Sequence, residues 1–181
     1  NVSFIRIIRL LAFIVSIFTP ALYIALTTHN QEALPLPFLL NFMAQRESVP
    51  FSALTEALFM SISFEILRES DIRKQSSTGS AVSILGGLIL GDAAVSAGII
   101  SPIMIIVISI SAISGLAFSS QEMIASLRWL RFLMMFLAMF FGIFGIYIGF
   151  LFLLSSLVTT KALDYPYFAP FSPLIKEELG D

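Results

Sequence analysis

Three carboxylates lie within apolar stretches of the chain and have the clearest capacity for chemistry. Glu56 and Glu65 fall between residues 51 and 69, and Asp92 falls in a run of small and apolar residues. A carboxylate is costly inside a bilayer, so such residues face protein or water and often mark ion pathways. Rings of acidic side chains also select cations in channels. The ion-pathway candidates are Glu56, Ser63, Glu65 and Asp92.

The alternative for these charges is structural pairing. At about 100° per residue, the polar side chains of residues 51 to 69 divide into two nearly opposite stripes. Glu56 lies on one stripe, and Glu65 and Arg68 lie on the other, at a spacing that allows an ion pair within one helix. Such a helix is enclosed by protein, lies at an interface or lines water. The residues that this hypothesis assigns to charge pairing are Arg46, Glu47, Glu65, Arg68 and Glu69.

Composition excludes most other chemistry. The chain has no Cys and a single His, so it lacks the residues of disulfide scaffolds, thiolate metal sites and cysteine nucleophiles. His29 stands in a polar loop without acids at ligand spacing, and we interpret it as a surface residue. No serine lies in a nucleophile elbow, and no lysine completes a phosphate loop. We therefore expect no enzyme, no metal and no cofactor, and the net charge of −2 disfavours nucleic-acid binding.

The elements that position the carboxylates are predicted to be membrane helices. Of 181 residues, 57% are hydrophobic and 12% are charged, whereas a globular protein has roughly 25% charged residues. Apolar runs of about 20 residues are long enough to cross a bilayer. The expected fold class is all-α: a polytopic transmembrane helical protein with four or five spans plus an amphipathic or re-entrant helix. We expect the protein to be located in a membrane, to cross it several times and to contact the lipid bilayer.

The proline, glycine and polar residues that interrupt the apolar runs predict six helical segments. They cover residues 5–26, with Pro20 inside, and then 38–45, 51–69, 79–98, 102–117 and 119 to about 158, the last as one long, tilted helix. If the segment 51–69 crosses the membrane, seven of the 10 Lys and Arg residues lie on the cytoplasmic side, against four if it does not. The positive-inside rule favours the first topology.

Small residues predict two seams at which helices approach closely. One seam lies in residues 79–98, and the other lies in the last long helix. The glycines assigned to helix packing are Gly79, Gly86, Gly87, Gly142, Gly145 and Gly149. We interpret residues 1–181 as one membrane domain with an N-terminal truncation, and residues 159–181 as an interfacial tail.

Several charged and proline-containing segments are more specific than hydrophobicity alone would produce. They include Arg46-Glu47-Ser48-Val49-Pro50-Phe51, Phe64-Glu65-Ile66-Leu67-Arg68-Glu69, Ser101-Pro102 and Tyr165-Pro166-Tyr167. Taken in order, they resemble the membrane region of the GerA family of spore germination proteins, the A subunits of nutrient germinant receptors. The resemblance covers nearly the whole chain.

This resemblance implies a spore inner-membrane protein whose soluble N-terminal domain is missing from this chain. It further implies action with a transporter-like B subunit and a lipoprotein C subunit. It also implies assembly into a homo-oligomeric channel or signal-transducing component, with monovalent cations as possible permeants. Two alternatives stay open: a secondary transporter, and a receptor-independent germination channel of the SpoVAF type. The second follows from departures such as Gly91-Asp92-Ala93-Ala94-Val95, where the family usually has Gln in place of Asp92.

Overall fold

The computed structural model describes the backbone of residues 2–73, 77–118, 121–159, 161–162 and 165–166, and the side chains of 4–70, 85–118 and 122–159. Apart from two short strands near its end, the regular structure of this part of the chain is helical, as expected from the sequence. The elements are α1 (Val2–Thr28), η1 (Gln31–Ala33), α2 (Leu36–Arg46), α3 (Ala53–Arg73), α4 (Ser77–Ser96), α5 (Pro102–Gly115) and α6 (Gln121–Thr159). A short antiparallel ladder pairs β1 (Lys161–Ala162) with β2 (Tyr165–Pro166).

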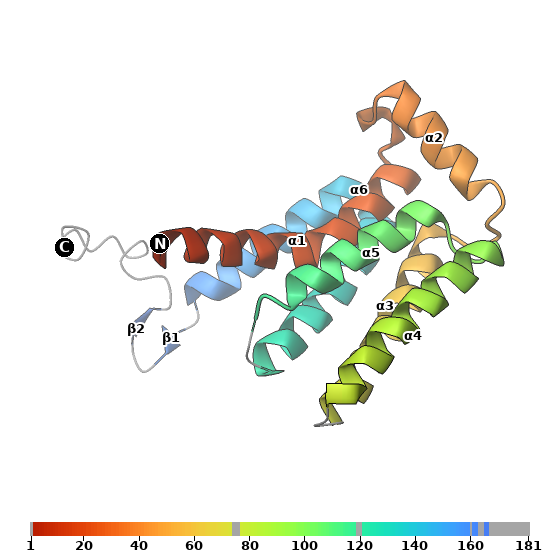
Figure 1. Ribbon diagram of the computed structural model, residues 1–181. Coiled ribbons are helices and arrows are strands. Elements are labelled where there is room, and N and C mark those ends of the chain that lie inside the picture. The colour runs from red at the N-terminus through yellow and green to blue at the C-terminus, as the bar shows by residue number, and fades with distance from the viewer. Residues whose placement is uncertain (1, 74–76, 119–120, 160, 163–164, 167–181) are drawn as a thin grey trace.

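Helix α1 forms the centre of the molecule. It packs mainly against α5 on one side and α6 on the other, while α3 and α4 lie beyond α5 and α2 lies across one end (Figure 1). The core consists of apolar side chains from these helices, among them Ile17, Ile24, Met104, Ile108 and Met134. None of the residues of α2 is buried, so this helix caps the bundle rather than entering it.

Local chemistry sets the ends of several helices. The Ser52 side chain accepts a hydrogen bond from the Thr55 backbone N–H at 3.3 Å, which caps the start of α3. Helix α4 ends at Ser96, and Gly98 follows it with a φ of +71°, a conformation that glycine adopts at low cost. Pro102 then occupies the first turn of α5, where its missing N–H is not needed. These signals place the α4–α5 turn between Ser96 and Pro102.

Helix α6 reverses direction at Gly142, which corrects the expectation of one long tilted helix. Gly142 has φ +63° and ψ −142°, outside the helical region. A Cβ placed on Gly149 would lie 2.5 Å from Met134 Sδ. Residues fifteen positions apart in a straight helix would be about 22 Å apart. The chain therefore folds back, and residues 121–141 and 143–159 form two antiparallel helical arms.

The segment that follows α1 holds this reversal in place. The Ile143 N–H donates a hydrogen bond to Asn30 Oδ1 at 3.0 Å, so Asn30 caps the start of the second arm. The His29 ring Nε2 donates to the Met139 carbonyl oxygen at the end of the first arm. His29 is solvent-exposed, as the surface interpretation expects, but it also contacts a second helix. The end of α1 and the turn of α6 are thus joined by two neighbouring side chains.

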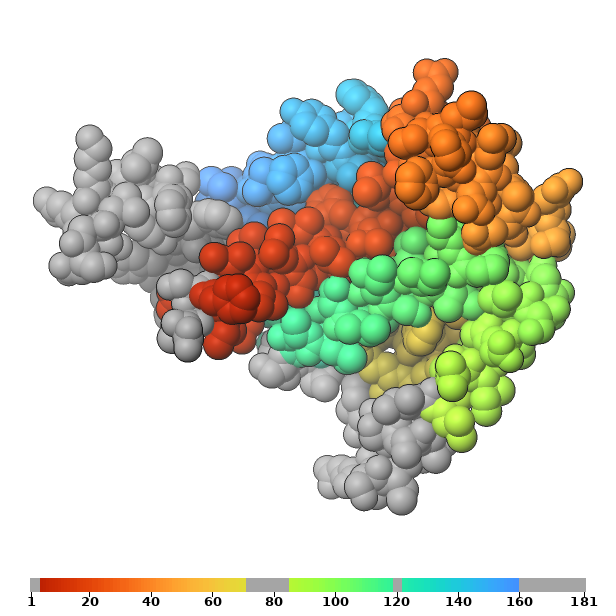
Figure 2. Space-filling model, turned by 45° about the horizontal axis from the view of Figure 1, so that its top comes forward, coloured from red at the N-terminus to blue at the C-terminus, as the bar shows by residue number. Residues whose placement is uncertain are grey.

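The apolar faces of the molecule point outward as well as inward. Phe140 and Phe152 on α6 are each 70% exposed, and Leu88 on α4 is 71% exposed. Two stretches are long and apolar enough to cross a membrane, Phe4–Thr28 and Glu122–Thr159. The described part of α4 and the whole of α5 are apolar but shorter. Figure 2 shows α1 as a long ridge between α6 and α5, with a hollow between α5 and α4.

Candidate functional site

Glu56 lies in a buried polar cluster at the end of the bundle near α2. The first turns of α3 bring its side chain, which is 1% exposed, against the start of α5. Glu56 Oε2 accepts hydrogen bonds from the Ser101 backbone N–H at 3.0 Å and from Ser101 Oγ at 2.9 Å. A carboxylate at a helix N-terminus satisfies free N–H groups and interacts favourably with the helix dipole. Glu56 therefore anchors α5 to α3.

Two further side chains complete this cluster. Arg46, the last residue of α2, places Nη2 3.6 Å from Glu56 Oε1. The Tyr23 hydroxyl of α1 is buried beside Ser101 and Arg46. Four elements thus meet at one carboxylate. Burial of a charge is tolerated when it is paired and hydrogen-bonded, and Glu56 meets both conditions.

A second charged cluster lies at the opposite end of α3. Glu65 pairs with Arg128 of α6 and with Arg68, whose Nη1 lies 3.9 Å from Glu65 Oε1. The Glu65 and Arg68 side chains are 16% and 18% exposed, so the pair is largely shielded from water. This arrangement includes the pair within one helix that the spacing suggests, and it adds a partner from a distant part of the sequence.

Arg131 extends the second cluster into the core. It is 6% exposed, and its Nε and Nη2 donate hydrogen bonds to the Ser16 carbonyl oxygen at 3.1 Å and to Ser16 Oγ at 3.0 Å. Gly115 packs at the same point, where a Cβ would lie 3.3 Å from Ser16 Oγ and 3.6 Å from Arg131 Nη2. A glycine at the end of α5 therefore makes room for the guanidinium group between α1 and α6.

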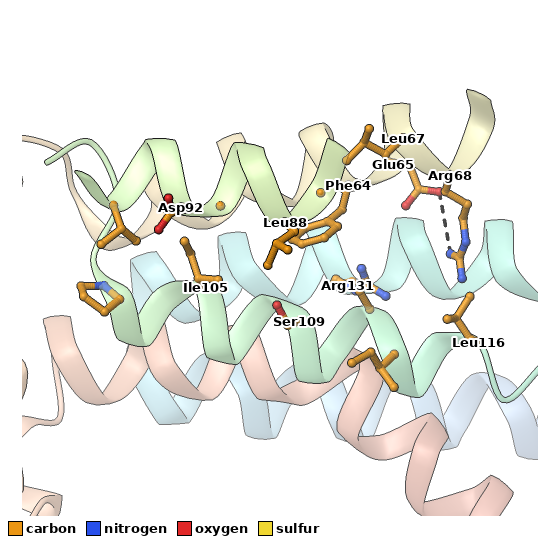
Figure 3. A pocket seen from close by; sticks show the side chains of 16 residues that line it. Phe64, Glu65, Leu67, Arg68, Leu88, Asp92, Ile105, Ser109, Leu116 and Arg131 are labelled. Atoms are coloured by element: carbon orange, nitrogen blue, oxygen red, sulfur yellow. Dashed lines mark ion pairs between the residues drawn. The ribbon is translucent and has the colours of Figure 1, made fainter. Parts of the chain in front are cut away.

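An open groove of about 790 Å³ separates α3 and α4 from α5. Its wall is largely apolar, but Glu65, Arg68 and Arg131 lie at one end and Asp92 lies at the other (Figure 3). Phe64, Leu88 and Ile105 lie between the two ends (Figure 3). The groove is thus an apolar surface with charges of opposite sign at its ends.

The ion-pathway candidates do not share one surface. Glu56 is buried at one end of α3, and Glu65 is held by arginines toward the other end. Ser63 donates its hydroxyl to the Phe59 carbonyl oxygen at 2.8 Å within α3. Asp92 is exposed on α4 and has no ion pair or hydrogen bond within the described part of the chain. Of the three carboxylates, Asp92 is the one that stays open to its surroundings.

The remaining sequence-predicted residues fall into several places. Glu47 and Glu69 are both exposed, and Glu69 has an interaction partner. Gly86 and Gly87 face the α3 side chains Leu67 and Phe64 at 3.4 to 3.6 Å, and Gly145 and Gly149 pack against the first arm of α6. Gly142 is the turn itself. The surroundings of Gly79, the Ser119 cap and most of the tail at 159–181 lie outside the described residues.

Several residues that hold the two clusters and the reversal of α6 together are not recognisable from the sequence. Ser101, Ser16 and Asn30 are small polar residues in apolar or turn regions, with partners 45, 115 and 113 positions away. A hydroxyl or amide of this kind is indistinguishable from any other in a one-dimensional pattern. Arg128 and Arg131 are visible in the sequence as interfacial residues, but their inward direction is set by the packing of α6.

The fold and its charges point to a class of protein before any comparison is made. Long apolar helices with exposed aromatic faces, together with arginines and carboxylates paired internally, suggest a helical membrane protein. No solved structure gives a significant match to the chain.

Comparison with known protein families identifies the family of this chain. The chain belongs to the GerA family: the model described as Bacillus/Clostridium GerA spore germination protein matches residues 1–181. Spore germination protein KA of Bacillus subtilis is 41% identical over 98% of this chain and 32% of its own length. The uncharacterized membrane protein YfkQ of the same species is 40% identical over 99% of this chain and 35% of its own length.

A relative from a second species is similar to this chain to a comparable degree and over a comparable share of its length. Spore germination protein GerQA of Bacillus cereus is 37% identical over 94% of this chain and 34% of its own length. The chain thus spans about a third of the length of the curated relatives it matches.

Proposed function

We propose that this chain is the membrane region of a germinant-receptor A subunit and that copies of it assemble around an ion pathway. The observation that carries the proposal is the exposed position of Asp92 on an apolar helix, in a family of spore germination proteins. An intramembrane carboxylate without a partner is stable only where water or another subunit meets it. A pathway between copies satisfies this requirement.

The internal arrangement supports a pathway between copies rather than through one copy. Glu56 and Glu65 are each tied to partners within the chain, at separate ends of α3. Their structural role leaves Asp92 as the carboxylate best placed to face permeant monovalent cations. Residues on the exposed faces of α4 and α6 then supply the contacts between copies.

The topology of the helices supports several crossings. Contacts between Glu56 and Ser101, and between Arg68 and the position of Gly115, make α3 and α5 run in the same direction. Helix α4 returns between them, and the two arms of α6 run in opposite directions. We infer that α1, α3, α4, α5 and both arms of α6 cross the bilayer. This places Arg9, Arg68, Arg128 and Arg131 toward one membrane face, which is cytoplasmic by the positive-inside rule.

By membership of its family, the subunit acts with other germination receptor subunits. We propose the transporter-like B subunit and the lipoprotein C subunit as these partners, in the spore inner membrane. A protein of this kind transmits a signal or conducts ions without an enzymatic step.

A secondary transporter is the competing function, and one observation favours it. In a transporter, α5 would be a half-helix inside the membrane rather than a full crossing: it has 14 residues and begins at a buried polar cluster, whereas a full span needs about 20. Broken helices of this kind line substrate sites in transporters. A transporter of this kind needs no second copy, because its site lies inside one chain.

Native mass spectrometry of the full-length protein in mild detergent distinguishes the two functions. We expect a closed oligomer of uniform subunit number that persists on dilution. A stable monomer that binds solute would contradict the channel proposal and favour the transporter.

A further inference from the structure

The groove between α4 and α5 has an unusual distribution of charge. At one end, the groove is lined by Glu65, Arg68 and Arg131. Glu65 pairs with Arg68 and also with Arg128 of α6, which is not part of the lining. Among the described side chains of this cluster, three arginines thus stand against the one carboxylate of Glu65, an excess of two positive charges. Asp92 lies at the far end of the groove (Figure 3) and adds a negative charge there. An anion that enters the groove is therefore attracted to the arginine end and repelled from the other.

Arg131 has hydrogen-bonding capacity to spare at the arginine end. A guanidinium group carries five N–H donors, and Arg131 uses Nε and Nη2 for Ser16. Its Nη1 has no hydrogen-bond partner in the described part of the chain, although the residue is 6% exposed and lines the groove. Arginine donors in this geometry match the oxygens of a phosphate group.

The rest of the groove is suited to a hydrocarbon chain. Its wall between the charged ends is formed by apolar side chains that include Phe64, Leu88, Ile105 and Ile113. Free phosphate would use the arginines and leave this apolar surface empty. A second copy of the chain would have to insert an acidic side chain among the arginines. An anionic phospholipid satisfies the guanidinium groups and the apolar wall together, and a bilayer supplies it at high concentration.

We propose that this groove is a binding site for one anionic phospholipid. The phosphate group binds Arg68 and Arg131, and an acyl chain lies along α5 toward Ile105. The lipid fills the space between α4 and α5 and fixes the angle between the α3–α4 pair and the rest of the bundle. This inference concerns a lipid site and does not depend on ion conduction.

The test uses the full-length protein in neutral detergent, titrated with phosphatidylglycerol and observed by native mass spectrometry. Wild type is expected to retain one phosphatidylglycerol per chain and to bind phosphatidylcholine at least tenfold more weakly. Arg68→Gln removes one phosphate ligand without touching the buried Ser16 contact, and it should weaken phosphatidylglycerol binding about tenfold. Arg9→Gln, which alters an exposed arginine of α1 outside the groove, should have no effect.

A second pair of variants tests the apolar wall with the charges intact. Ala112→Phe places a ring in the groove and should abolish the retained lipid, whereas Ala93→Phe adds the same ring on an exposed α4 position outside it. Equal binding of the two lipids, or unchanged binding in both Arg68→Gln and Ala112→Phe, would overturn the proposal.

Two further results would identify a different occupant. If inorganic phosphate at millimolar concentration displaced phosphatidylglycerol, the site would be a simple anion site. If Ala112→Phe dissociated the oligomer while lipid retention stayed intact, the groove would be a contact between copies. Either result contradicts a lipid site.

Discussion

Glu56 illustrates how a single residue changes meaning when its neighbours are known. In the sequence it is an isolated acid and a natural candidate for an ion pathway. In the structure its carboxylate accepts two hydrogen bonds from Ser101 and faces Arg46. These contacts join α2, α3 and α5, so the first expected effect of altering Glu56 is on stability.

We predict that Glu56→Ala lowers the free energy of unfolding by about 3 kcal/mol, because Ser101 and Arg46 lose a buried partner. Glu56→Gln keeps one carbonyl oxygen and should cost about 1 kcal/mol. Thermal unfolding of the purified protein in detergent measures both. Glu47→Gln is the control, since Glu47 is exposed and its substitution should change stability little. An Ala variant as stable as wild type would refute the anchoring role.

At the scale of the element, the reversal inside α6 depends on one glycine. Gly142 has a backbone conformation that other residues adopt only with strain. A Cβ there would also collide with Asn30 Oδ1, the atom that caps the second arm. Both the space around position 142 and its backbone conformation therefore require glycine.

Gly142→Ala is therefore expected to destabilise the protein by about 2 to 3 kcal/mol. Gly91→Ala is the matched control: Gly91 lies inside α4, and a Cβ there would make an ordinary 3.7 Å contact with Ile105. That control should be neutral or raise stability by about 0.5 kcal/mol. Melting temperatures of the two variants decide the point, and similar values would argue against the reversal.

The helices themselves were largely predictable from the sequence, but the reversal was not. Proline and glycine at 102 and 98 mark the α4–α5 turn, and the segment at 38–45 corresponds to α2 at Leu36–Arg46. In α6, the spacing of Gly142, Gly145 and Gly149 fits a packing seam on one helix as well as a turn followed by a seam. The turn is distinguished from the single helix by the hydrogen bond of Asn30, which is more than a hundred positions away in the sequence. The sequence pattern predicted the Glu65–Arg68 pair because the two residues are three positions apart in one helix. It did not predict the pairing of Glu65 with Arg128, because Arg128 is distant in the sequence.

At the scale of the whole molecule, the reversal determines how the chain is threaded through a bilayer. The inferred topology places both ends of α6 at one membrane face and Ile143 at the other. This chain has no native cysteine, so single cysteines report position directly.

We predict that Ser126→Cys and Ser155→Cys react with a membrane-impermeant maleimide from the same side, and Ile143→Cys from the opposite side. All three positions are exposed. Labelling of Ser126→Cys and Ser155→Cys from opposite sides would restore the single tilted span and exclude two antiparallel arms in the membrane.

The central claim is that copies of this chain enclose a cation pathway faced by Asp92. Its most direct test is ion selectivity, measured as the reversal potential of the full-length protein in a planar bilayer under a potassium chloride gradient. We predict cation selectivity in wild type, weaker selectivity in Asp92→Asn, and a shift toward chloride in Asp92→Lys. Glu32→Lys, the same charge reversal at an exposed residue outside the bundle, should leave the potential unchanged. Oligomeric protein that conducts no ions, or the same reversal potential in wild type and Asp92→Lys, would contradict the account.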